Sequence, residues 1–197
     1  MTCMKRIRTL AAVAALATLI SPAGAVTTQT TQFSYFPVSG NSPAEIYRAI
    51  LRSGPRVDGS KALAATTANG VQNSMLTQDG TSCRVTSFRV QFRFVVNLPH
   101  LINAYGLSNE DRRLWGQFSE FLKRHELQHT RLWLRCAADL ELKVMAIKAS
   151  TCAAVTATSD KLWKQMQANC NRKQTDFDTE QRAELLRQPF MRRVMGQ

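Results

Sequence analysis

The sequence lacks several features that would place a chain in a familiar class. Beyond residue 25 no apolar run is long enough to cross a bilayer, no Cys-x-x-Cys pair is present and no internal repeat occurs. A membrane-spanning chain, a cysteine-held metal site and a repeat array are therefore not expected. Histidine is also scarce, with 3 residues in 197, so histidines that cluster need a physical explanation.

The first 25 residues have the composition of a secretory signal peptide. Lys5, Arg6 and Arg8 precede a short apolar stretch over residues 9–20, and an Ala-x-Ala pattern ends at Ala25. We expect cleavage after Ala25. The mature protein should be soluble and exported, either periplasmic or secreted, without a lipid anchor.

Acidic residues are few relative to basic ones. The formal charge is +12, and removing Lys5, Arg6 and Arg8 with the signal peptide lowers it to +9. This balance favours anionic partners such as cell-envelope polymers. The basic residues are scattered and do not cluster with aromatics, so no specific nucleic-acid partner is expected.

Four cysteines remain after signal cleavage, namely Cys83, Cys136, Cys152 and Cys170. An even number in an exported chain predicts two disulfides, and four cysteines allow three pairings. We favour Cys152 with Cys170, because closure of a helix–loop–helix unit would bring them together. Cys83 would then pair with Cys136.

The order of the expected elements predicts an α+β fold, with a mostly antiparallel N-terminal sheet and a short helix followed by long helices. Residues 26–197 are expected to form a single domain. It should contain a flexible leader (26–32) and strands at 33–38, 64–75 and 87–96. Helices are expected at 42–52, from 108 past Lys148, at 153–171, and at 178–195 with a break near Pro189. The clearest strand alternates phenylalanine with arginine, which predicts one buried and one polar face.

The most informative motif is His125-Glu126-Leu127-Gln128-His129. Residues four apart lie on one face of a helix, so both imidazoles can point at one metal ion. Zinc accepts imidazole readily and lowers the pKa of its bound water to about 7. Glu126 could accept a proton from that water as general base. We therefore expect one Zn²⁺ per chain, with His125 and His129 as ligands.

The third zinc ligand is not evident from spacing alone. No Gly-x-x-His follows His129, so the extended three-histidine pattern is absent. Asp139 and Glu141 would lie roughly 15 Å or more along the helix. The remaining candidates are His100 upstream, and Asp160, Asp176, Asp178, Glu180 and Glu184 downstream.

The chain resembles the DUF922 family, bacterial secreted proteins predicted to be zinc-dependent proteases. The resemblance rests on residues 33–40, the Ser53-Gly54-Pro55 break, Ser82-Cys83-Arg84-Val85 leading into a strand that ends at Leu98-Pro99, and the histidine motif. It implies a zincin-like fold with the motif on the active-site helix. Many members carry an aromatic-Asp pair followed by Thr-x-His-Gly. Phe177-Asp178 fits the pair but no histidine follows, which makes Asp178 the first candidate for the third ligand.

These features predict an exported zinc metallopeptidase that hydrolyses peptide bonds in envelope peptides or proteins. An extended substrate would add as a strand to the sheet edge near the motif helix. Two alternative functions remain open. One is a degenerate, non-catalytic zincin-fold protein that binds an anionic partner, and the other is a zinc amidase that acts on cell-wall peptides.

Overall fold

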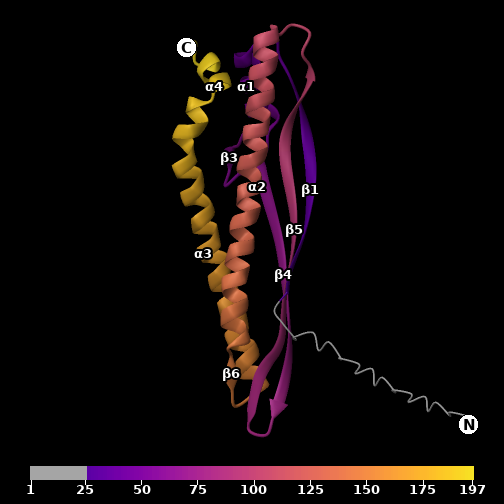
Figure 1. Ribbon diagram of the computed structural model, residues 1–197, viewed down its shortest axis with the longest axis vertical. Coiled ribbons are helices and arrows are strands. Elements are labelled where there is room, and N and C mark those ends of the chain that lie inside the picture. Colours follow the sequence, from indigo (N-terminus) through magenta and orange to yellow (C-terminus); the bar gives the residue numbers. More distant parts are fainter. Residues whose placement is uncertain (1–25) are drawn as a thin grey trace, which may run out of the picture.

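The computed structural model describes residues 26–197 (Figure 1). The expected signal peptide lies outside the described residues. The elements follow in the order β1 (Val26–Ser39), α1 (Pro43–Ser53), β2 (Arg56–Val57), β3 (Ser60–Lys61), β4 (Ala65–Asp79), β5 (Ser82–Asn103), α2 (Asn109–Met145), β6 (Lys148–Ala149), α3 (Cys152–Arg187) and α4 (Pro189–Val194). The α+β class expected from the sequence is confirmed.

A mixed sheet with strand order β1-β5-β4 forms one layer, and the short β6 also pairs with β5. The pairs β4–β5 and β5–β6 are antiparallel, whereas β1 runs parallel to β5. The β4–β5 hairpin turns at Gly80, whose φ is 55°. This left-handed backbone strongly favours glycine, so the Asp79-Gly80 signal in the sequence is borne out.

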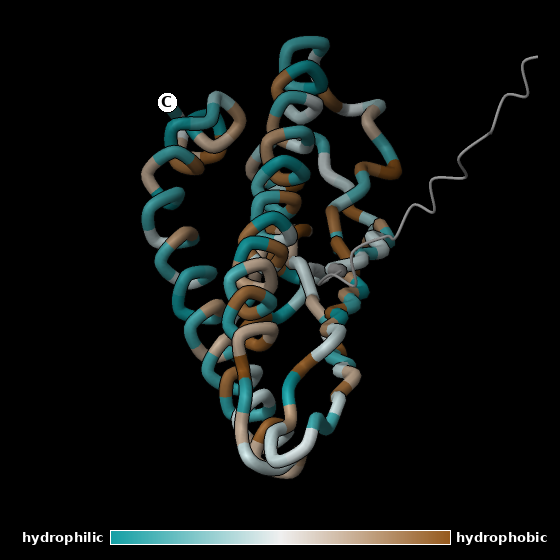
Figure 2. The backbone as a smooth tube through the Cα atoms, turned by 60° about the horizontal axis from the view of Figure 1, so that its bottom comes forward, coloured by the Kyte–Doolittle hydropathy of each residue, from teal (hydrophilic) through white to brown (hydrophobic). Residues whose placement is uncertain are grey.

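The helices α2 and α3 lie side by side over one face of the sheet (Figure 1). Around both helices hydrophobic positions alternate with hydrophilic ones, as Figure 2 shows. The buried face of β5 presents a row of apolar side chains to Ala137, Leu140 and Val144 of α2. Gly70 of β4 leaves room for this packing, since a Cβ there would meet the ring of Phe92 at 2.5 Å.

Helix α1 begins and ends where its sequence predicts. Ser42 is the N-cap, and its Oγ accepts a hydrogen bond from the Glu45 N–H at 3.3 Å. Pro43 occupies the first turn, where its missing N–H removes no helical bond. The helix ends at Ser53, before Gly54. It packs with α4 in a cluster that also contains Phe118 and Phe190.

Residues 26–32 are not the expected flexible leader. They form the first half of β1 and pair with Arg89–Val95 of β5. The segment is rich in threonine, and its residues 28–32 are all exposed, so it carries no alternation of buried and polar positions. Its backbone bonds to β5 hold it in the sheet, which hydrophobic patterning cannot reveal.

Three other boundaries also differ from the sequence prediction. Helix α2 ends at Met145 and does not continue past Lys148, which belongs to β6. Strand β5 continues through Pro99 to Asn103. Beyond Asn97 it pairs with β1 only, because β4 begins at Ala65, opposite Asn97. A strand tolerates proline where one of its edges is unpaired, so Pro99 does not end β5. The expected helices at 153–171 and 178–195 are joined through residues 172–177 into α3, which ends at Arg187. The expected break near Pro189 is confirmed, and the short α4 follows it.

The favoured disulfide pairing is wrong. The bonds join Cys83 to Cys152 and Cys136 to Cys170. Because α3 is continuous, Cys152 and Cys170 are 18 residues apart in one helix, about 27 Å at 1.5 Å per residue. The two actual bonds instead tie the start of β5 to the start of α3, and α2 to the middle of α3.

Over residues 26–197, no helix has the length and apolar character needed to span a bilayer.

Candidate metal centre

Helix α2 places both motif histidines on one face, one turn apart. Ser108 caps the helix, with its Oγ accepting a hydrogen bond from the Asp111 N–H at 3.0 Å. The side chains of His125 and His129 are 19% and 12% exposed. Their Nε2 atoms lie 3.2 Å apart. The two rings therefore converge on one point.

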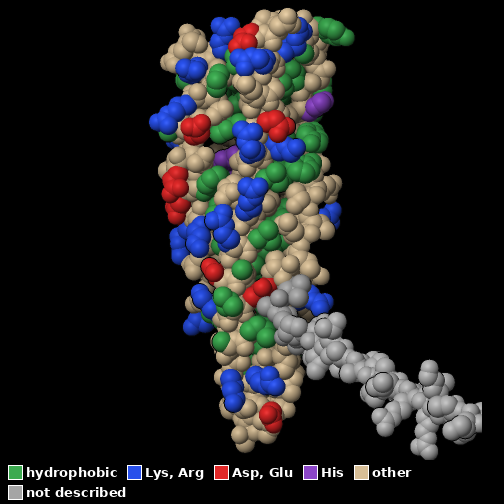
Figure 3. All heavy atoms as spheres, in the orientation of Figure 1, with side chains coloured by type: hydrophobic (Ala, Val, Ile, Leu, Met, Phe, Trp, Pro, Cys, Tyr) green, Lys and Arg blue, Asp and Glu red, His purple; other side chains and the backbone are tan. Residues whose placement is uncertain are grey.

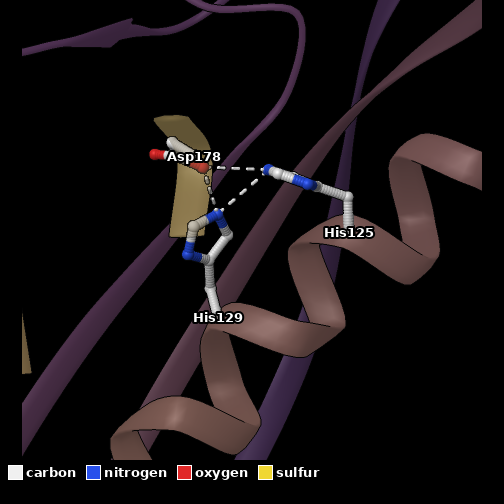
Figure 4. A group of neighbouring side chains, drawn as sticks. All are labelled: His125, His129 and Asp178. Carbon is white, nitrogen blue, oxygen red and sulfur yellow. Dashed lines mark hydrogen bonds and ion pairs between the residues drawn. The ribbon is translucent and has the colours of Figure 1, made fainter. Parts of the chain in front are cut away.

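The third member of the cluster comes from α3. Asp178 Oδ1 lies 3.0 Å from Nε2 of His125 and 3.0 Å from Nε2 of His129 (Figure 4). The aromatic residue before it, Phe177, stacks on the His125 ring with centroids 4.9 Å apart and meets the His129 ring edge-on. These contacts limit rotation of both imidazoles. Asp178 itself is half exposed.

Gln174 determines which nitrogen of His129 carries a proton. Its Nε2 donates to the His129 carbonyl at 3.3 Å, which leaves its Oε1 as the acceptor 2.6 Å from His129 Nδ1. Nδ1 therefore bears the proton, and Nε2 of the neutral ring presents a lone pair to the cluster. A hydrogen bond at the far nitrogen is typical of metal-binding histidines.

Three electron-pair donors that face one another need a cation or a proton between them. Burial disfavours a charged His129, but hydrogen bonds to Asp178 and Gln174 outweigh this and raise its pKa. Burial also opposes ionisation of Asp178, yet hydrogen bonds from His125 and His129 hold its pKa well below its usual range. A divalent cation would satisfy all three donors at once.

The spacing of the donors fits zinc. Three ligands of one tetrahedral zinc at 2.0–2.2 Å lie about 3.4 Å from one another. The observed separations of 3.0, 3.0 and 3.2 Å are within a few tenths of an ångström of this value. Two imidazoles and one carboxylate are also a common protein donor set for catalytic zinc.

Glu126 lies beside the cluster and faces the sheet. It is 4% exposed, and its Oε2 accepts a hydrogen bond from the Thr66 Oγ1 of β4 at 2.8 Å. Burial raises the pKa of Glu126, although nearby His129 and the Thr66 hydroxyl act in the opposite direction. A carboxylate with a raised pKa is suited to accepting a proton near neutral pH.

The cluster opens into a cleft of about 990 Å³. Its walls come from the start of β4, from the β2–β3 segment, and from the facing sides of α2 and α3. Apolar side chains such as Phe121 and Trp133 line it together with the cluster residues and Glu126. A concave site with a few convergent polar groups is typical of a ligand-binding or catalytic site.

A comparison with known protein families identifies the family of this chain. The family model described as "Bacterial protein of unknown function (DUF922)" matches residues 33–184, most of the chain. The chain belongs to the DUF922 family. No curated protein and no solved structure gives a significant match. The matched region includes β4, α2 and the part of α3 that carries Gln174 and Asp178.

In this DUF922 protein only one of the downstream acids joins the two histidines. The structure brings Asp178 to them, whereas Asp160 instead accepts a hydrogen bond from Gln72 at 2.9 Å. His100 lies near Tyr35, with ring centroids 6.1 Å apart. The other downstream candidates, Asp176, Glu180 and Glu184, are outside the cluster.

Sequence reasoning missed Thr66 and Gln174. Gln174 precedes Asp178 by four residues, so the two share a face of α3. That signal could have been used only if α3 had been predicted as one helix through residues 172–177. Thr66 has no comparable signal, because its contact with Glu126 depends on how β4 packs against α2.

Replacing Gln174 by leucine is expected to weaken zinc binding about 10- to 100-fold, the usual effect of losing the partner of a ligating histidine. Zinc affinity would be measured by competition with a chromophoric chelator. Gln181→Leu is the matched control, because Gln181 lines the same cleft on α3 but makes no hydrogen bond to the histidines. Equal affinities for the two variants would show that Gln174 does not orient His129.

Proposed function

We propose that the protein is an exported zinc-dependent peptidase. The observation that carries the proposal is the convergence of His125, His129 and Asp178 beside the buried Glu126, at the wall of a large cleft. His125, His129 and Asp178 would hold one zinc per chain. The two disulfides are consistent with export.

Glu126 would act as the proton acceptor in hydrolysis. What zinc supplies at such a site is a water with a pKa near 7 and polarisation of the scissile carbonyl. Glu126 directly follows His125 on α2 and lies in a desolvated position that raises its pKa. It can take a proton from the attacking water and pass it to the leaving amine. The Thr66 hydroxyl holds the carboxylate in place.

The start of β4 would bind the substrate backbone. β4 is an edge strand of the sheet, and its residues 65–68 line the cleft next to Glu126. An edge strand has unpaired N–H and C=O groups that an extended peptide can bond. This geometry favours a peptide or an unfolded protein segment as substrate.

The first test is zinc content. We expect elemental analysis of the mature, oxidised protein to find one zinc per chain. His129→Ala should raise the zinc dissociation constant at least about 100-fold, more than loss of a supporting hydrogen bond would. His100→Ala is the control, since His100 lies outside the cluster.

The second part of the test is cleavage of an unfolded protein, such as reduced and alkylated casein, with and without a chelator. Chelator-sensitive cleavage that His129→Ala abolishes would support the peptidase. A cell-wall peptide in the same panel separates peptidase from amidase activity. A wild-type protein that holds no zinc after zinc loading and dialysis would overturn the proposal.

A further inference from the structure

Over residues 84–93 of β5 and the paired residues of β4, the sheet has a second face that carries exposed side chains. Along β5 buried side chains alternate with exposed ones over residues 88–94, and along β4 half-buried side chains alternate with exposed ones over residues 66–77. The inward positions pack against α2 and α3, as described above. The outward positions include Arg84, Arg89 and Arg93 on β5, and all three are exposed. Gln91 lies between the last two, and Asn69 and Asn73 of β4 pair with Arg93 and Arg89. We call these six residues the arginine face.

The arginine face carries positive charge without compensating acid. Of the 14 acidic residues in the chain, only Asp79 lies in β1, β4 or β5, at the tip of the hairpin. Among residues 26–197, Arg84, Arg89 and Arg93 have no carboxylate within ion-pair distance. The one side-chain hydrogen bond from Arg93 goes to the neutral Gln32 Oε1, at 3.3 Å.

The helical side of the molecule differs in this respect. There, Lys and Arg side chains are interspersed with Asp and Glu (Figure 3). Arg113 pairs with Glu110, and Arg193 lies 3.6 Å from Asp111. Mixed charge of this kind is ordinary for a solvated surface. A sheet face that carries only cationic side chains creates a positive electrostatic potential along an extended strip.

We propose that the arginine face binds an acidic polysaccharide. Arg84 and Arg93 are nine residues apart in one strand, about 30 Å at 3.3 Å per residue, which suits an extended linear polyanion. The guanidinium groups would pair with carboxylate or phosphate groups. The amides of Gln91, Asn69 and Asn73 would bond the hydroxyls of the sugar.

The side chains on this face favour a polysaccharide over a nucleic acid. Proteins that bind single-stranded nucleic acid stack bases on aromatic side chains, and no residue of the arginine face is aromatic. Further along β5, in the same outward alternation, Val95 and Asn97 line the cleft. A polymer on this face would therefore run toward the cleft, but binding needs neither zinc nor Glu126.

The test measures binding of the mature protein to polygalacturonate, a linear carboxylate polymer, at low and at physiological salt. The variant is Arg89→Gln with Arg93→Gln, both at exposed positions. The matched control is Arg48→Gln with Arg52→Gln, which removes two exposed arginines that are also four residues apart. Circular dichroism and thermal unfolding would verify that both variants are folded.

We expect salt-sensitive binding by the wild type, at least about tenfold weaker binding by the arginine-face variant, and less than a twofold change in the control. Equal losses in both variants would mean that only net charge matters, and would overturn the proposal. Absence of binding would also overturn it. Tighter binding of single-stranded DNA or anionic vesicles through the same arginines would replace the polysaccharide as the partner. His129→Ala should bind the polymer like the wild type, so this result is separable from that of the zinc test.

Discussion

A Glu126→Gln variant is expected to bind zinc as tightly as the wild type and to cleave its substrate about 10²- to 10⁴-fold more slowly. Glu126 is not among the three convergent donors, so metal content should not change. The amide can still accept the Thr66 hydrogen bond through its Oε1, so the local packing is retained. What the variant loses is the proton acceptor, and general-base catalysis typically contributes this factor.

Initial rates on the casein substrate, together with zinc content, would check this expectation. Glu120→Gln is the matched control, because Glu120 lies exposed on the same helix and the substitution removes the same charge. The control should retain full activity. Full cleavage by Glu126→Gln with zinc bound would mean that another group accepts the proton, and the assigned role of Glu126 would be wrong.

Removing the bond between Cys136 and Cys170 by alanine substitution is expected to lower the free energy of unfolding by about 4 kcal/mol. The bond joins cysteines with a sequence separation of 34. A crosslink across a loop of this length lowers the conformational entropy of the unfolded chain, which stabilises the folded state by about this amount. The variant should also bind zinc more weakly. The bond fixes α3 against α2 only four residues from Gln174 and eight from Asp178 on α3.

The other disulfide provides the control. Cys83 and Cys152 have a sequence separation of 69, so their removal should destabilise the protein by a similar amount, about 4 kcal/mol. Cys152 is 26 residues before Asp178 in α3, about 39 Å along the helix. Zinc affinity of the folded variant should therefore be unchanged. Denaturant unfolding and chelator competition measure the two effects. Equal zinc affinity in both cysteine variants would show that the α2–α3 bond does not hold the site together.

The parts of the fold that the sequence predicted well have strong local signals. Ser42-Pro43 sets the start of α1, Asp79-Gly80 sets the hairpin turn, and the alternation along β5 sets its buried face. The placement of His125 and His129 on one face follows from helical periodicity alone. In each case the deciding interaction lies within a few residues of sequence.

The parts that were missed depend on contacts between distant segments. Residues 172–177 are mostly polar and look like a loop, but they are helical in α3. The wrong disulfide pairing has a different cause: Cys152 and Cys170 stand at the two ends of the helix already expected at 153–171, and the helical rise between them was not taken into account. Asp178 was one of several downstream candidates, and only the family resemblance made it the first, because no helical spacing relates α3 to α2. The contact of Thr66 with Glu126 likewise depends on tertiary packing.

The parallel pairing of β1 with β5 has a consequence for the order of folding. The β4–β5 and α2–α3 pairs are each joined by a short connection, so their contacts form with little loss of chain entropy. Val26 meets Arg89 across more than 60 residues, and such non-local pairing is slow. We therefore expect strand β1 to join the sheet last. Until it does, the edge of β5 is open to strands of other molecules, so concentrated refolding of this protein favours aggregation at that edge.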